Sequence, residues 1–144
     1  MESGVARLHS QEDGFLHHII GRLELEDVDV VTGRAEEIAH QDHYREQFAL
    51  VLSRAVARLP SLVELALPLC QIGGIFISQK KGEIAGEVAR AASAVNVLGG
   101  EAVSIREVEL EELGEKRYLV VVNKVSPTPQ QYPRRPGIPT RHPL

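Results

Sequence analysis

Apolar side chains recur at three- and four-residue intervals in three long stretches of the chain. These stretches are residues 11–25, 60–69 and 84–98. The spacing predicts amphipathic helices, because it places the apolar side chains on one face of a 3.6-residue turn. Pro60 fits the first turn of the second helix, and Gly99 follows the third as a stop signal.

Shorter apolar stretches have the β-branched composition or the two-residue alternation that is typical of strands. They are residues 5–8, 28–32, 48–54, 75–78, 102–110 and 117–125. The continuous apolar run that begins at Phe48 predicts a strand buried on both faces, as in a parallel sheet. Residues 102–110 alternate as in an antiparallel strand, and an acidic turn at 111–115 joins them to the strong strand 117–125, so we expect an antiparallel hairpin.

Strands and helices alternate along most of the chain, which predicts an α/β fold: a parallel sheet with helices on both faces. The 144 residues fit one domain with room for a core. We place that domain at residues 1–125 and a C-terminal tail at 126–144. The tail holds six of the eight prolines, a density that we expect to exclude helix and sheet and to favour extended polyproline conformations.

Charge is distributed unevenly between these two parts. Residues 1–115 hold 10 basic and 20 acidic side chains, a net charge of −10, whereas residues 116–144 hold six basic side chains and no acid, a net charge of +6. A basic tail on an acidic body suggests contact with a polyanion. The alternative is a solvated tail that happens to be basic.

Several classes of protein do not fit the sequence. No apolar run is long enough to span a bilayer, and the N-terminus has no signal-peptide pattern. The single cysteine, Cys70, allows no intrachain disulfide and suits a cytoplasmic setting; its apolar neighbours favour a buried hydrophobe over a nucleophile. Residues 40–43 contain metal-ligand types without the spacing of a zinc site, so we expect no metal.

Two charged residues follow the carboxyl ends of predicted strands, where open α/β sheets bind ligands. Arg54 stands where the third strand stops, and its guanidinium has five donors and a permanent charge. Glu36 follows Gly33 and could accept hydrogen bonds from ribose hydroxyls or cap backbone amides. The alternatives are a surface arginine that covers a strand end and an acid favoured by a helix dipole.

Several short segments occur together in an order that closely resembles the 16S rRNA guanine-N7 methyltransferase G family, also called glucose-inhibited division protein B. The likeness extends from about Val5 to Leu144. The segments are Gly33-Arg34-Ala35-Glu36, Tyr44-Arg45-Glu46, Ser53-Arg54-Ala55-Val56-Ala57, Gly73-Gly74-Ile75-Phe76 and Tyr132-Pro133-Arg134-Arg135-Pro136-Gly137-Ile138-Pro139.

The resemblance implies a Rossmann-like S-adenosylmethionine methyltransferase sheet, mostly parallel, with a C-terminal antiparallel hairpin. Its activity would be methyl transfer from S-adenosylmethionine to guanine N7 of 16S rRNA. By position, Ala35 and Glu36 match the family's adenosine-side contact, and Arg54 matches an arginine beside the cofactor and the acceptor.

The resemblance also implies an RNA partner, either free 16S rRNA or the small ribosomal subunit. Lys80 matches a lysine that follows the fifth strand of the family, and Arg134, Arg135 and Arg141 match its basic tail, for which phosphate binding is expected. We expect no catalytic side chain, because guanine N7 has a lone pair and no proton and therefore needs no general base.

The sequence departs from the family at three places. It lacks the first strand with its glycine-rich loop, so the edges of strands 5–8 and 48–54 should face a gap or pair directly. His9 and Ala49 stand where the family usually has acids. We therefore expect an N-terminally truncated or degenerate member that by itself binds S-adenosylmethionine weakly or not at all. The alternative function is an inactive RNA-binding remnant or a gene fragment.

Overall fold

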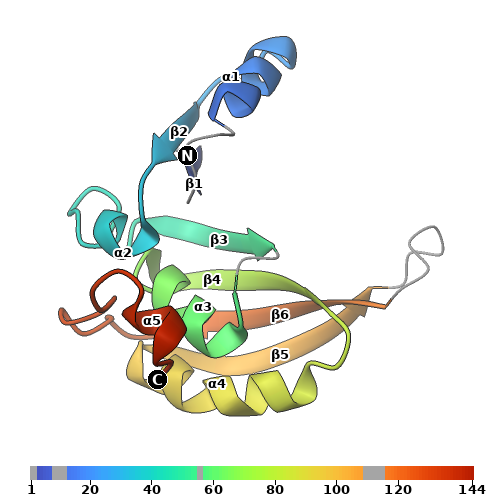
Figure 1. The fold of residues 1–144 in the computed structure, drawn as a ribbon, viewed down its shortest axis with the longest axis vertical. Helices are drawn as coiled ribbons and strands as arrows, with labels where there is room; N and C mark the ends of the chain where they lie inside the picture. Colours follow the sequence, from blue (N-terminus) through green and yellow to red (C-terminus); the bar gives the residue numbers. More distant parts are fainter. Residues whose placement is uncertain (1–2, 8–12, 55–56, 109–115) are drawn as a thin grey trace.

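The computed structural model describes residues 3–7, 13–54, 57–108 and 116–144, which form two separate sheets (Figure 1). His9 and the expected acidic turn at 111–115 lie outside the described residues. The elements are, in order, β1 (Ser3–Arg7), α1 (Asp13–Arg22), β2 (Val28–Thr32), α2 (Ala35–Ile38), β3 (Phe48–Arg54), α3 (Leu59–Ala66), β4 (Cys70–Lys81), α4 (Ala85–Val97), β5 (Gly100–Val108), β6 (Arg117–Lys124) and α5 (Ile138–Arg141).

The first sheet is a parallel pair, β1 with β2, whose register runs from Ser3 opposite Val28 to Arg7 opposite Thr32. The helix that connects the two strands, α1, contacts β2, and this β1–α1–β2 unit extends away from the rest of the molecule (Figure 1). The helix expected over 11–25 is confirmed within its described part. Its apolar face has little to pack against, and Phe15 is 63% exposed.

The second sheet has four strands in the order β3-β4-β6-β5. β3 and β4 are parallel, whereas β6 runs antiparallel to both β4 and β5. The expected hairpin of the last two strands is therefore confirmed. Two of the four strand ladders in the described residues, β1–β2 and β3–β4, are parallel, so the expected mostly parallel sheet is a mixed one.

One edge of β1 and one edge of β3 carry no ladder partner among the described residues, since β1 pairs with β2 and β3 pairs with β4. Of the two arrangements expected around the absent first strand, direct pairing of strands 5–8 and 48–54 is therefore not found in the part of the chain that the structure describes. Unpaired strand edges present free backbone donors and acceptors.

Helices α3 and α4 pack on one face of the four-stranded sheet (Figure 1). The expected helices on both faces are wrong for this sheet. Side chains alternate along β3, so Val51 points into the core while Leu50 and Leu52 point to the opposite face. Leu52 is 64% exposed there. This face is left uncovered because α1, the helix expected on it, belongs to the separate two-stranded unit.

The main core lies between the four-stranded sheet and the helices α3 and α4. Its fully enclosed side chains come from all these elements, among them Val63, Phe76 and Val120. Gly99 lets the chain turn directly from α4 into β5, with a φ of +82°. A Cβ at this position would lie 2.1 Å from the Ser126 carbonyl oxygen, so only glycine fits.

The C-terminal tail packs against the body. The expectation that its prolines exclude helix is wrong for α5, because Pro139 falls in the first turn, where no backbone N–H is needed. Pro139 is itself buried, and α5 contacts α3. In Figure 1 the tail runs past α2 and α3 and ends near α4.

Candidate functional site

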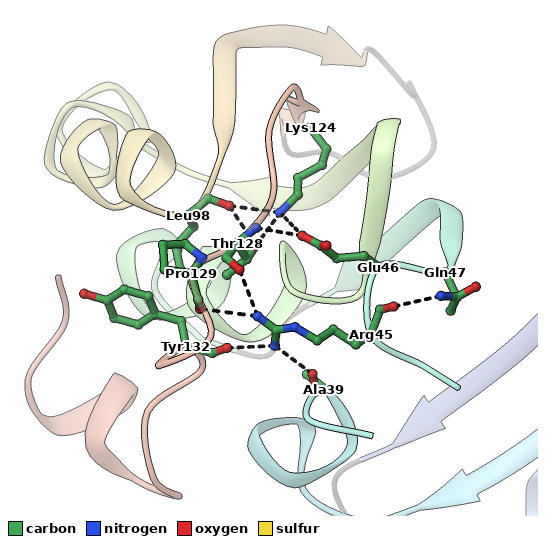
Figure 2. A network of polar contacts seen from close by, with 9 residues as sticks. All are labelled: Ala39, Arg45, Glu46, Gln47, Leu98, Lys124, Thr128, Pro129 and Tyr132. Carbon is green, nitrogen blue, oxygen red and sulfur yellow. Dashed lines mark hydrogen bonds and ion pairs between the residues drawn. The ribbon is translucent and has the colours of Figure 1, made fainter. Parts of the chain in front are cut away.

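The tail is fastened to the body by Arg45, which lies in the turn before β3 (Figure 2). Its guanidinium donates to four backbone carbonyl oxygens. One nitrogen reaches Ala39 at 3.0 Å and Tyr132 at 2.9 Å, and the other reaches Thr128 at 3.0 Å and Pro129 at 3.3 Å. Because three of these carbonyls belong to the tail, Arg45 holds the tail through its backbone.

A buried polar cluster lies beside Arg45 (Figure 2). Lys124 is 1% exposed and donates from Nζ to the Leu98 carbonyl at 3.0 Å and to the Thr128 hydroxyl. It also pairs with Glu46 at 3.1 Å, and Glu46 accepts the backbone N–H of Thr128 at 2.6 Å. Burial lowers the pKa of Lys124, and the hydrogen bond and charge of Glu46 oppose that shift. The cluster thus joins the end of α4, the end of β6 and the tail.

Arg134, expected to bind RNA phosphate, is engaged within the protein. Its backbone N–H and its Nε donate to one carboxylate oxygen of Glu64 at 2.8 and 2.9 Å, and its Nη2 donates to the other at 2.6 Å. Glu64 lies in α3 and is fully buried. Its hydrogen bond and charge raise the pKa of Arg134. The guanidinium therefore has an internal counterion, and its RNA role stays a prediction.

Glu36, expected to contact the cofactor, also faces the tail. It lies in the first turn of α2, is buried, and accepts the backbone N–H of Gly137 at 2.9 Å. Ala35 begins the same helix and is half-buried. The carboxylate therefore orders the start of α5.

Arg54 is exposed at the carboxyl end of β3. α2 lies near the opposite end of that strand, because Ile38 packs in a small cluster that includes Phe48 (Figure 1). Seven residues of strand span about 20 Å. The structure places Arg54 at the opposite end of β3 from Ala35 and Glu36 and does not bring the three residues together. Their cofactor role stays a prediction.

Lys80, the other residue expected to contact RNA, is mostly buried near the end of β4. Its Nζ donates to the Ala57 carbonyl at 2.6 Å and pairs with Glu87 at 2.8 Å. Glu87 also accepts the backbone N–H of Leu59. Burial raises the pKa of Glu87, but the hydrogen bonds from Lys80 and Leu59 and the charges of Lys80 and Arg90 together bring it below its usual value.

The remaining expected RNA contacts, Arg135 and Arg141, are exposed on the tail. Neither makes an ion pair or a side-chain hydrogen bond to another described residue. Because Arg45, Glu36 and Glu64 fasten the tail, these two guanidinium groups are presented from an ordered backbone.

The roles of Arg45, Lys124 and Thr128 were missed by reasoning from the sequence. Arg45 drew attention only as part of a family-like segment, and Lys124 was counted only among the basic residues of 116–144. A usable signal was present, because Lys124 shares the inward-facing parity of Val120 and Val122 in β6. That parity predicts a buried charge, which requires a partner.

Three further features of the described residues concern membrane insertion, metal binding and the single thiol. No helix in the described part of the chain is long and apolar enough to cross a membrane. The same residues contain no group of three or more His, Cys, Asp or Glu that could hold a metal ion. Cys70 is buried, as expected, and burial raises the pKa of its thiol to about 11.

Comparison with solved structures supports the fold. An rRNA methylase from Streptococcus thermophilus superposes with a TM-score of 0.61 over 85% of this chain and 73% of its own, at 14% identity. PigF, solved with SAH, gives a TM-score of 0.59 over 87% of this chain and 49% of its own, at 17% identity. At such identities the likeness shows the fold, that of Rossmann-like methyltransferases.

Sequence comparison identifies the family. A protein named ribosomal RNA small subunit methyltransferase G from Roseiflexus castenholzii is 48% identical over 90% of this chain and 55% of its own length. A protein of the same name from Dehalococcoides mccartyi is 43% identical over 100% of this chain and 61% of its own length. This chain therefore spans little more than half of these curated relatives. The family described as GidB, rRNA small subunit methyltransferase G, matches residues 10–119, and the chain belongs to that family.

Proposed function

We propose that this protein acts in methyl transfer from S-adenosylmethionine to N7 of a guanine in 16S rRNA of the small ribosomal subunit. The observation that carries the proposal is the family match over residues 10–119, together with relatives that bear the methyltransferase name. A ribosomal RNA substrate goes with the cytoplasmic setting expected from the sequence.

The chemistry asks for positioning more than for reactive side chains. S-adenosylmethionine supplies the methyl group, and N7 supplies the electron pair without first losing a proton. The rate then depends on holding the guanine in line with the methyl group. Arg54 fits a role in orienting the base through O6, as arginine does in guanine readout. It must leave N7 free, because N7 is the nucleophile.

A second candidate function, RNA binding without methyl transfer, is favoured by one observation. Ala35 and Glu36 lie near one end of β3, whereas Arg54 lies at the other (Figure 1). A chain whose expected cofactor residues do not converge could keep its docked basic tail and yet bind S-adenosylmethionine weakly.

The experiment that separates the two functions uses small ribosomal subunits that lack the modification. The 144-residue protein is incubated with these subunits and with S-adenosylmethionine labelled in its methyl group. Label that enters 16S rRNA and maps to guanine N7 supports methyl transfer. Salt-sensitive binding to the subunits without label supports the second function, and the absence of both contradicts the two together.

A further inference from the structure

A partly enclosed pocket of about 280 Å³ lies where α3 and α4 begin and where the end of the tail meets them. Figure 1 shows the C-terminus beside α4 and α5. The pocket adjoins the carboxyl ends of β3 and β4, because Lys80 of β4 reaches both Ala57 and Glu87 beside it. Its lining residues are Arg58, Pro60, Glu87, Arg90, Pro143 and Leu144.

Two arginines supply cationic groups at the surface of the pocket. Arg58 and Arg90 are exposed, and neither guanidinium has a hydrogen bond or an ion pair with any residue that the structure describes. Glu87, the acidic side chain in the lining, is already bonded to Lys80 at 2.8 Å and to the backbone N–H of Leu59. Leu144 ends the 144-residue chain and adds its α-carboxylate to the lining, so Arg58, Arg90 and Lys80 face two carboxylates and one positive charge remains for a ligand.

The other lining residues have apolar side chains. Pro60 is buried in the first turn of α3, and the Leu144 side chain packs against the main core. An apolar floor beside two guanidinium groups suits a ligand that has both an anionic group and a flat ring. Guanidinium groups match phosphate oxygens with paired, charge-assisted hydrogen bonds.

The first backbone N–H of α3 plays no part in this recognition. The Leu59 N–H is already bonded to Glu87, so the two side-chain cations are the donors that remain. The volume is near the lower end of the range for small-molecule sites, roughly 300–1,000 Å³, so it holds a small ligand.

We propose that this pocket binds one phosphate-bearing nucleotide unit of an RNA strand, with Arg58 and Arg90 on the phosphate and Pro60, Pro143 and Leu144 beneath the sugar or base. The proposal rests on the proposed function for its source of nucleotide, which is ribosomal RNA. It adds a contact site on the body to the expected contacts of the tail, Arg135 and Arg141.

The test compares two double variants that lose the same charge. Arg58→Gln with Arg90→Gln removes the pocket cations, and Arg22→Gln with Arg106→Gln removes two exposed cations elsewhere. Binding to a fragment of 16S rRNA is measured between about 50 and 200 mM salt, and circular dichroism confirms that all proteins are folded. We expect the pocket variant to lose at least fivefold in affinity, with its salt slope reduced by about one.

The control variant should bind the RNA within twofold of the original protein. Equal weakening by both variants would overturn the proposal, because it would show a response to net charge alone. If the double pocket variant does not fold, the single variant Arg90→Gln is used instead, because it changes one exposed side chain on α4 and should leave the fold intact. If that folded variant binds RNA like the original protein, the proposal falls.

A second arm distinguishes RNA from a free nucleotide. Guanosine 5′-monophosphate and guanosine are titrated while the amide resonances of Arg90 and Leu144 are followed. Shifts with the monophosphate that are absent with guanosine and in the pocket variant support phosphate recognition. If those shifts occur while RNA binding ignores the pocket variant, the pocket belongs to a free nucleotide and the RNA assignment is overturned.

These outcomes are separable from those of the proposed function. RNA binding that depends on Arg58 and Arg90 without any methyl transfer supports the pocket and contradicts the methyltransferase. Methyl transfer by the pocket variant with an unchanged KM for the subunits supports the methyltransferase and contradicts the pocket.

Discussion

The β1–α1–β2 unit and the four-stranded half of the molecule use similar residues with different results. None of the side chains at residues 14–34, all of which the structure describes, is buried. In the other half, Phe76 and Val120 are completely enclosed between sheet and helices. Both parts contain apolar strands and an amphipathic helix, so composition does not account for the contrast.

What differs is the number of strands that each helix can cover. A two-stranded pair gives α1 too little surface to bury its apolar stripe, whereas four strands support both α3 and α4. The four-stranded half is also held together by Arg45 and Glu64, which fasten the tail across it. This half therefore carries most of the stability of the chain.

The largest expected difference in stability is between two variants that each truncate one phenylalanine, one in each region. Phe76→Ala removes a fully buried ring and should lower the free energy of unfolding by about 3–5 kcal/mol. Phe15→Ala changes a ring that is 63% exposed and should cost no more than about 0.5 kcal/mol. Urea unfolding followed by circular dichroism measures both. Similar losses for the two variants would remove the distinction between the regions.

The fastening of the tail should give the next largest effect. Arg45→Lys keeps the charge but replaces the fork with one ammonium, which cannot reach the carbonyls of Ala39, Thr128 and Tyr132 together. We expect a loss of about 1.5–3 kcal/mol in the same unfolding measurement.

Arg135→Lys is the matched control for Arg45→Lys, because Arg135 is exposed on the tail, and it should change stability by less than about 0.5 kcal/mol. If Arg45→Lys were equally neutral, the tail would be held by other contacts, and Glu64 would be the next residue to change.

A smaller effect should appear as a dependence of stability on pH. The pKa of Glu87 is below its usual 4.5, so its ionised form stabilises the fold fully above that pH. This contribution, about 1 kcal/mol, is lost as the pH falls through the lowered pKa. Glu87→Gln should therefore be less stable than the original protein at pH 7, with the difference shrinking below pH 4.5. Glu101→Gln, an exposed control, should show no such change; a constant difference for Glu87→Gln would contradict the assigned cause.

The smallest perturbation uses the native thiol as a probe of the well-packed half. Burial raises the pKa of Cys70 to about 11, so at pH 8 little thiolate exists to react. A thiol reagent should label the folded protein at least tenfold more slowly than the urea-unfolded protein. A matched Leu23→Cys, Cys70→Ser variant places the thiol in the exposed unit and should react nearly as fast folded as unfolded. Rapid labelling of Cys70 in the folded state would show that β4 opens readily.

The sequence was most informative where structure is local. Side-chain periodicity predicted α4 and the β5–β6 hairpin to within a few residues, because each depends on a repeat that neighbouring positions display. It did not predict that α1 would stay outside the main sheet, since that depends on which strand edges meet. Nor did it predict the docked tail, because Arg45 and Tyr132 are 87 positions apart.

The sequence pointed to residues of cofactor- and phosphate-binding types, but it did not predict which contacts these residues make in the fold. Glu36, Lys80 and Arg134 are cofactor- or phosphate-binding types, but each has a partner within the protein. Such pairings depend on contacts between distant elements, which one sequence does not display. The pocket formed by Arg58, Arg90 and the end of the tail was missed for the same reason.

Arg45 holds the tail by main-chain carbonyls, and every residue type supplies that group. The side chains at Pro129 and Tyr132 contribute only their backbone oxygens to this contact. Position 45 should consequently tolerate almost no exchange in a saturation library, while the positions whose carbonyls it binds accept many. The amino-acid sequence of the tail could then vary among related proteins while the tail still docks in the same place.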